Sequence, residues 1–168
     1  MTLKEAEGSV RIDLPREQVW DQLCDLSLAH NYVPGVAATR IDTQQREGVG
    51  ASRTVIMNNG SEMQETVEEW DEGRSFLLRL HRGDKPAMPI FKRFYFRYAI
   101  EDDGHGTLSR PALLYETRFG LLGWMLGKLA HRQMQKSAQD VGIAMKDFYE
   151  TGNRVTPERL KELKNAKK

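Results

Sequence analysis

The sequence predicts an α+β fold, with an antiparallel sheet of about six or seven strands and a long C-terminal helix. Two observations support this prediction. A run of about six strand patterns, joined by short turns, fills the middle of the chain, and such runs form antiparallel meanders. The helical patterns lie only before and after this run, which is typical of a layered α+β domain. A chain of 168 residues is long enough to bury one core of this kind.

The N-terminal pattern is a strand followed by a helix. Over residues 7–15 every second residue is apolar, as expected of a half-buried strand. Pro15 suits the first position of a helix, and apolar residues then recur at spacings of three and four from Val19 to Leu26. The sequence therefore predicts a short amphipathic helix after the first strand.

The central strands are expected at residues 36–43, 50–70, 75–82, 91–103 and 107–119. Asn59-Gly60 favours a two-residue hairpin turn inside the second of these segments. That turn would pair Ile56 with Met63 and Thr54 with Glu65. Pro111 cannot donate to a sheet ladder, so the last strand is expected to be bulged or at an edge there.

Alternation within these strands predicts which side chains face the interior. Ile56, Met63 and Val67 should share the inward face, and Thr54 and Glu65 should lie on that face too. In the fourth segment the inward residues are predicted to be Phe94, Phe96, Tyr98 and Ile100. An inward carboxylate needs a partner or a proton, so Glu65 is a candidate general acid or base, or a polar contact for a ligand. The alternative is that Glu65 lies near the rim of the sheet, where it is either exposed to solvent or paired with a neighbouring arginine.

A long helix is predicted from residue 121 to about 149, with Gly152 as its stop. One face of it is apolar and is expected to pack on the sheet; it consists of Ala130, Met134, Ala138, Val141, Met145 and Phe148. Small residues on this face leave volume unfilled, and methionine adapts to irregular shapes. Residues 153–168 are predicted to be a polar tail, with Thr156 as the cap of a short helix.

The helix begins with the stretch GLLGWMLGKLAHRQM, which is uncharged until Lys128. The uncharged run is far shorter than the roughly 20 residues that span a bilayer. It is therefore buried in protein, faces a guest molecule, or forms an exposed apolar patch. In the last case Leu121, Leu122 and Trp124 would contact a membrane surface or a protein partner.

Three stretches together resemble the START-like, or SRPBCC, superfamily, which includes polyketide cyclase/dehydrase-like proteins and Bet v 1-type ligand binders. They are LPREQVWDQLCDLSLAHNYVPGV, GASRTVIMNNGSEMQETVEEW and YETRFGLLGWMLGKL. The resemblance covers about residues 7–152, so residues 1–152 are expected to form the START-like domain. It implies a helix-grip fold, in which the sheet wraps the helix and leaves a cavity between them.

The expected cavity gives a first hypothesis for function: the protein binds a small hydrophobic molecule such as a lipid, an isoprenoid or a polyketide-like compound. The predicted ligand-binding residues are Tyr32, Thr54, Ile56, Met63, Glu65, Phe96, Tyr98, Met134, Ala138, Val141 and Met145. The alternative is a polyketide cyclase or aromatase that uses the same cavity, with Glu65 and either Thr54 or Tyr98 in proton transfer. A docking module with the patch around Trp124 is the third hypothesis.

Composition argues against several other classes of protein. With 25 basic and 24 acidic residues the formal charge is +1, which argues against nucleic acid as the partner. The four histidines and the single cysteine, Cys24, show no metal-ligand spacing, and we expect neither a metal nor a cofactor. One cysteine forms no internal disulfide, and the first residues contain no secretory apolar segment, so the cytoplasm is the expected location. Cys24 is expected to be a buried thiol.

Overall fold

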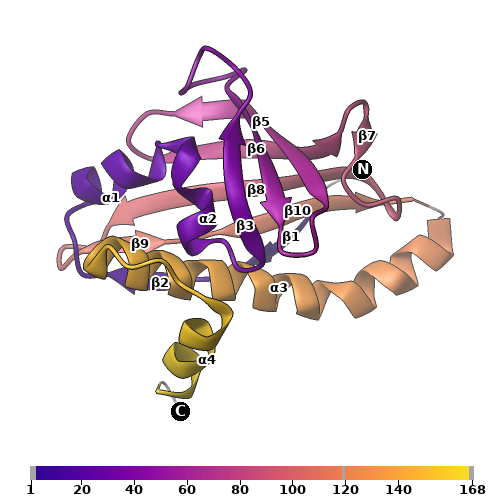
Figure 1. Cartoon of the computed structure of the whole chain (residues 1–168). Coiled ribbons are helices and arrows are strands. Elements are labelled where there is room, and N and C mark those ends of the chain that lie inside the picture. The colour runs from indigo at the N-terminus through magenta and orange to yellow at the C-terminus, as the bar shows by residue number, and fades with distance from the viewer. Residues whose placement is uncertain (1–2, 119, 167–168) are drawn as a thin grey trace.

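A strongly curved antiparallel sheet wraps around one long helix in the computed structural model (Figure 1). The structure describes residues 3–118 and 120–166, and side chains of the long helix from Ala130 onward. The strands are β1 (Lys4–Glu7), β2 (Val10–Ile12), β3 (Val36–Ile41), β4 (Ser52–Met57), β5 (Glu62–Asp71), β6 (Ser75–Arg82), β7 (Lys85–Pro86), β8 (Phe91–Asp102), β9 (Thr107–Ser109) and β10 (Ala112–Thr117). The helices are α1 (Arg16–Leu23), a 3-10 turn (Leu26–Leu28), α2 (Ala29–Tyr32), α3 (Gly120–Thr151) and α4 (Pro157–Asn165).

The predicted helix-grip architecture is confirmed. Seven strands form a continuous path in the order β1-β10-β8-β6-β5-β4-β3, while β2, β7 and β9 pair beside it. The helices α1 and α2 lie at one end of the sheet and β7 lies at the other, with α3 running along the concave side between them (Figure 1). Within the described residues, no helix is long and apolar enough to cross a bilayer.

The strand predicted over residues 7–15 corresponds to β2 alone, and a further strand, β1, precedes it across a break at Gly8 and Ser9. β1 pairs with β10, and β2 pairs with β9. The break lies where α3 touches the sheet: a Cβ atom on Gly8 would lie 2.6 Å from the backbone nitrogen of Gln139. The Gln139 side chain accepts a hydrogen bond from the Ser9 N–H at 2.9 Å and donates one to the Ser9 carbonyl at 3.0 Å. This contact positions α3 against the sheet.

The hairpin between β4 and β5 differs from the prediction by one residue. Its loop consists of three residues, 58–60, because the Met57 N–H donates to the Ser61 carbonyl at 2.8 Å. Gly60 closes the loop with a φ of +80°, a conformation that glycine adopts without strain. The observed register therefore pairs Arg53 with Glu65.

Relative to the prediction, this one-residue shift places every β4 side chain on the opposite face of the sheet. Val55 now lies opposite Met63, and Thr54 lies opposite Gln64. The prediction that Thr54 and Ile56 share the inward face with Glu65 is therefore wrong. The Thr54 hydroxyl instead donates to the Asp42 carboxylate at 2.7 Å, on the outer face.

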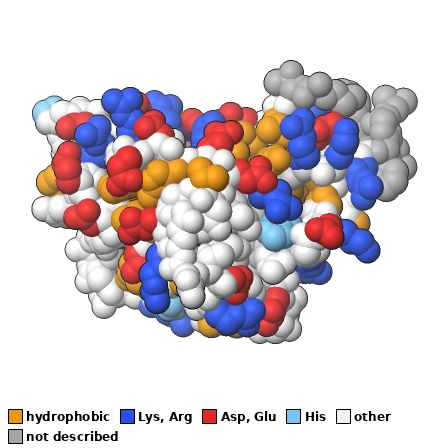
Figure 2. All heavy atoms as spheres, turned by 90° about the horizontal axis from the view of Figure 1, so that it is seen from above, with side chains coloured by type: hydrophobic (Ala, Val, Ile, Leu, Met, Phe, Trp, Pro, Cys, Tyr) orange, Lys and Arg blue, Asp and Glu red, His pale blue; other side chains and the backbone are white. Residues whose placement is uncertain are grey.

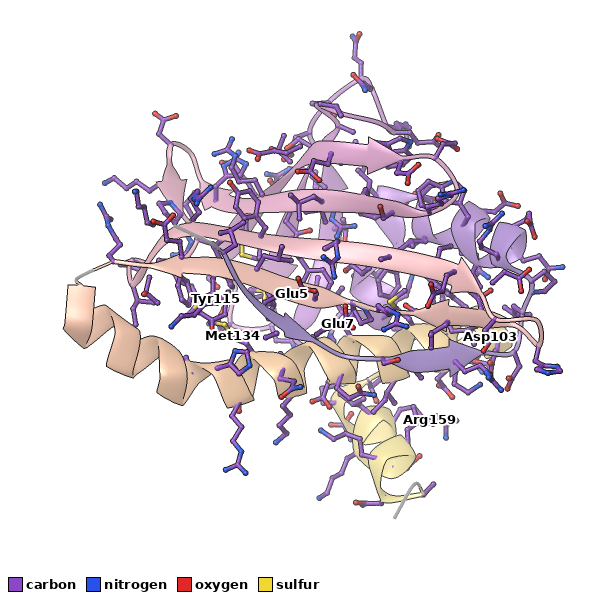
Figure 3. The ribbon with its side chains drawn as sticks, turned by 180° about the vertical axis from the view of Figure 1, so that it is seen from behind. Glu5, Glu7, Asp103, Tyr115, Met134 and Arg159 are labelled. Carbon is purple, nitrogen blue, oxygen red and sulfur yellow. The ribbon has the colours of Figure 1, made fainter. Side chains whose placement is uncertain are left out.

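The predicted apolar face of α3 is buried against the sheet. Met134, Ala138, Val141, Met145 and Phe148 are each less than 9% exposed. Tyr115 of β10 and Met134 lie close together between the sheet and α3 (Figure 3). The helix ends as predicted, because Gly152 adopts a φ of +76° and its N–H donates to the Phe148 carbonyl at 2.7 Å.

The segment predicted as a polar tail contains α4, which packs on the rest of the molecule. The Thr156 hydroxyl caps α4 by accepting from the Arg159 N–H at 3.2 Å. Leu160 is buried, and two ion pairs tie α4 to α3: Arg159 to Asp147 at 2.8 Å, and Lys164 to Asp140 at 2.6 Å. The described part of the tail is thus continuous with the core of the domain.

Candidate functional site

A cavity of about 290 Å³ lies between the concave face of the sheet and α3. The residues that line it come from β5, β6, β8, β10 and α3, and from two loops. They are Met63, Glu65, Leu80, Phe94, Phe96, Tyr98, Leu113, Ser137, Asp140, Val141, Val33, Pro34 and Met88. Most of these side chains are apolar, so the cavity offers a hydrophobic environment inside the fold.

Strand alternation places the lining side chains, as predicted for β8. Phe94, Phe96 and Tyr98 all line the cavity. The intervening Arg97 lies on the outer face, where it forms ion pairs with Glu5 and Glu7 of β1 (Figure 3). The inward orientation of Phe94, Phe96 and Tyr98 is therefore confirmed.

A buried ion pair underlies the inner part of the cavity wall. Arg53 of β4 is 1% exposed and Glu65 of β5 is 6% exposed. The Nε of Arg53 donates to Oε2 of Glu65 at 2.6 Å, and its Nη1 donates to the Leu26 carbonyl at 2.8 Å. Burial alone would lower the pKa of Arg53, but the Glu65 carboxylate outweighs burial and the pKa is raised above its ordinary value. Arg53 is therefore a permanent cation inside the fold.

One carboxylate oxygen remains available to the cavity. Glu65 lines the cavity, and its Oε2 is used by Arg53. Its Oε1 accepts no hydrogen bond from the residues that the structure describes. A ligand with a hydroxyl group could therefore donate to Oε1 without displacing the Arg53 bond.

Three buried tyrosines surround this ion pair. The Tyr32 ring stacks on Phe148 with centroids 6.0 Å apart, and contacts Tyr98 at 6.3 Å and Tyr149 at 5.4 Å. Burial raises the pKa of Tyr98 and of Tyr149 well above the ordinary value, while the positive charge of Arg53 opposes the rise. Burial likewise raises the pKa of Tyr32. Tyr98 lines the cavity together with Glu65, and its raised pKa keeps its hydroxyl neutral.

The remaining polar lining residues, on α3, are already engaged. The Ser137 hydroxyl donates to the Gln133 carbonyl of its own helix at 2.9 Å. Asp140 forms the ion pair with Lys164 of α4. Among the lining residues that the structure describes, Glu65 and Tyr98 are therefore the polar side chains that are left to contact a ligand.

The predicted ligand-binding residues fall into three groups. Those that line the cavity are Met63, Glu65, Phe96, Tyr98 and Val141. Those that are buried elsewhere in the core are Tyr32, Met134, Ala138 and Met145. Those on the outer side of β4 are Thr54 and Ile56, because of the shifted register.

Sequence reasoning missed Arg53, which holds Glu65 in place. The signal was present in the hairpin: Asn58-Asn59-Gly60 also suits a three-residue loop with a left-handed glycine. That register brings an arginine opposite the glutamate, and two opposite charges facing each other across a pair of strands stabilise it. Leu80 and Leu113 were also missed, because two neighbouring strands were not assigned inward faces.

Two other predicted features lie apart from the cavity. Burial, followed by the nearby carboxylate of Glu47, raises the pKa of the Cys24 thiol to about 11, as suits an unreactive cysteine. The side chains of Leu121, Leu122 and Trp124 lie outside the described residues. No group of metal-binding side chains is present among the residues that are described.

Comparison with known proteins assigns the chain to a family. Residues 4–145 match the family model described as polyketide cyclase / dehydrase and lipid transport. The chain belongs to this family. The matched residues include the whole sheet and most of α3, so the family match covers the cavity. No curated protein matches the sequence.

Solved structures share the helix-grip fold of this family member at low sequence identity. A protein from Thermus thermophilus is 19% identical, with a TM-score of 0.67 over 89% of this chain and 99% of that chain. Ara h 8.0201 is 14% identical, with a TM-score of 0.67 over 89% and 99%. The di-domain ARO/CYC StfQ from the steffimycin biosynthetic pathway is 9% identical, with a TM-score of 0.68 over 89% of this chain and 51% of that chain. These likenesses show the fold alone.

Proposed function

We propose that the protein binds a small hydrophobic molecule with one polar group, in the cavity between the sheet and α3. The observation that carries this proposal is the lining: apolar side chains surround about 290 Å³, and Glu65 and Tyr98 supply the free polar groups. This volume is near the lower end of the roughly 300–1,000 Å³ typical of ligand pockets. The family description, which names polyketide chemistry and lipid transport, supports the same class of ligand.

The size of the cavity favours a compact ligand. Burying about 300 Å² of apolar surface at about 25 cal/mol per Å² stabilises a complex by about 7 kcal/mol before the costs of association. A two-chain phospholipid is much larger than the cavity. A short isoprenoid or a polyketide-like aromatic compound fits its volume and its aromatic wall better.

The polar groups define where the ligand's own polar group would lie. A ligand hydroxyl can donate to Oε1 of Glu65 and accept from the Tyr98 hydroxyl, whereas a carbonyl can only accept. Because a buried polar group without a partner is destabilising, this end of the cavity selects for a hydroxyl or keto group over a pure hydrocarbon. Arg53 fixes Glu65 in position before the ligand enters.

Native mass spectrometry of protein purified from its own host tests the proposal. The expected result is a bound small organic molecule on the wild type, which is lost when Val141→Trp fills the cavity. Ile56→Trp makes the same change on the outer face of β4 and is expected to retain the molecule. Circular dichroism shows whether both variants fold, and Leu113→Trp is a second cavity-filling variant. Retention of the molecule in both folded cavity-filling variants would contradict the proposal.

A cyclase or dehydratase in the same cavity is the second candidate function. The observation that favours it is that Glu65 and Tyr98 face one cavity, since proton transfer needs two polar groups near a substrate. Tyr98→Phe distinguishes the two functions with little change in shape. If the protein is an enzyme that eliminates water from its substrate, the variant should retain a molecule heavier by one water than that on the wild type; a binding protein should retain the same molecule.

A further inference from the structure

The end of the sheet that carries β7 has an exposed apolar tip beside the cavity. Met88, in the loop after β7, is 46% exposed and also lines the cavity. Its neighbour Pro89 is exposed too. Among the described residues, the other large hydrophobic side chain with high exposure is Val49, at 59%. Val49 lies in the loop before β4. Arg46 and Glu47 of the same loop line a pocket together with Asp21 of α1. This region lies at the far end of the sheet from β7 (Figure 1).

Basic side chains surround this tip. Residues 82–93 and 116–118 contain five of them, Arg82, Lys85, Lys92, Arg93 and Arg118, against two acidic residues, Asp84 and Glu116. Figure 2 shows lysine and arginine side chains gathered at this end, with hydrophobic atoms between them. Because the whole chain has a formal charge of only +1, this excess is local.

Backbone contacts hold these residues together as one surface, which we call the β7 end. Arg82 lies opposite Lys85 in the β6–β7 pair. The Phe91 N–H donates to the Met88 carbonyl at 3.1 Å, and the Arg118 N–H donates to the Ile90 carbonyl at 2.9 Å. The apolar tip and its surrounding cations therefore lie at the same end of the sheet, joined by backbone hydrogen bonds.

The two acidic residues, Asp84 and Glu116, offset only part of this charge. Glu116 is 7% exposed, and its carboxylate accepts from Arg93 at 2.7 Å and from Lys92 at 3.5 Å. The Lys92 side chain nevertheless remains 67% exposed. Arg82, Lys85 and Arg118 are exposed. Net positive charge therefore faces the solvent around Met88.

A lipid bilayer with anionic headgroups matches this combination. Anionic headgroups attract basic side chains within about 8 Å at physiological salt, and a small apolar tip gains free energy at the headgroup boundary. A specific protein partner would need about 800 Å² of this surface to be complementary, which a single exposed Met-Pro tip does not supply. We propose that the β7 end docks the protein on an anionic membrane, with Met88 inserted and the cavity edge facing the lipid.

Vesicle co-sedimentation tests this docking surface directly. Wild-type protein is expected to bind vesicles of phosphatidylcholine mixed with phosphatidylserine, to bind phosphatidylcholine vesicles much more weakly, and to be released by salt. Changing Arg82 and Lys85 together to Glu should lower the partition coefficient at least about tenfold. Met88→Asp should lower it too, because insertion of the tip contributes.

The matched controls make the same changes at the opposite end of the sheet. Arg46→Glu and Val49→Asp should leave vesicle binding unchanged. Equal binding to neutral vesicles, or an equal loss in these controls, would overturn the proposal. Full binding by Met88→Asp together with loss in the Arg82 and Lys85 variant would also overturn it, because that result indicates a general affinity for polyanions.

Docking extends the proposed binding function, since it places the ligand cavity against a source or acceptor of hydrophobic molecules. The two proposals are tested separately. The cavity-filling variant Val141→Trp should bind vesicles like the wild type, whereas the Arg82 and Lys85 variant should still retain the small molecule in native mass spectrometry. Loss of vesicle binding in a folded Val141→Trp variant would contradict docking through the β7 end alone.

Discussion

Arg53 and Glu65 depend on each other, because each is a charge buried away from water. Glu65→Leu leaves the Arg53 guanidinium without its carboxylate, so we expect the free energy of unfolding to fall by about 3–5 kcal/mol. The double variant with Arg53→Met and Glu65→Leu should regain most of this loss, because no charge then remains buried. Urea denaturation of the wild type, both single variants and the double variant measures the coupling.

An exposed ion pair provides the control for this cycle. Arg79 and Glu68 are 2.8 Å apart, but each side chain is more than a third exposed. Glu68→Leu should therefore change stability by less than about 1 kcal/mol. If Glu65→Leu has an effect as small as Glu68→Leu, the buried pair does not hold the wall of the cavity as we describe.

The buried tyrosines make stability depend on pH in the alkaline range. Their folded-state pKa lies above the unfolded value near 10, so the folded protein keeps protons that the unfolded chain loses. Stability should be unaffected by these groups below about pH 10 and should fall above it, by up to about 1.4 kcal/mol per pH unit for each tyrosine. Tyr98→Phe should make this slope less steep. Urea denaturation between neutral and strongly alkaline pH measures it, and an identical slope in Tyr98→Phe would contradict the assignment.

At the scale of elements, the contact between Gly8 and α3 determines how closely the helix approaches the sheet. A Cβ atom at Gly8 would lie 2.7 Å from the Cα of Gln139, which is backbone and cannot rotate away. We expect Gly8→Ala to lower the free energy of unfolding by about 1–3 kcal/mol through overpacking. Ser9→Ala is the matched control, because the described contacts of Ser9 with Gln139 involve only its backbone. Thermal unfolding measures both, and an equal effect would contradict this role of Gly8.

The elements themselves were largely predictable from the sequence, because their signals are local. The period-two pattern of β8 and the three- and four-residue spacing of α3 each depend on residues within a few positions. The register of the β4–β5 hairpin was not predictable in this way, because an Asn-Asn-Gly sequence is compatible with a loop of two or three residues. The choice between them depends on Arg53 meeting Glu65 and on Thr54 meeting Asp42, contacts that join different strands.

Across the whole molecule, the sequence pattern and the family resemblance led to the helix-grip fold, but neither could locate the cavity. A cavity is the space that side chains of several elements leave unfilled, so it depends on packing rather than on periodicity. Met134 and Met145 have the same helical periodicity as Val141, yet Val141 lines the cavity and the two methionines fill the core beside it. The joining of Arg118 to the basic stretch at residues 82–93 was equally hidden, since it depends on how β10 pairs with β8.

The central claim is that a hydrophobic molecule binds between the sheet and α3, and methionine-methyl NMR tests it most directly. Met63 and Met88 line the cavity, while Met145 is buried against Ser109 and provides an internal control. Titration with 2-naphthol, an aromatic compound with one hydroxyl group, should shift the methyl signals of Met63 and Met88 to saturation and leave that of Met145 in place. A titration that leaves Met63 unchanged, or that shifts Met145 alone, would contradict the account.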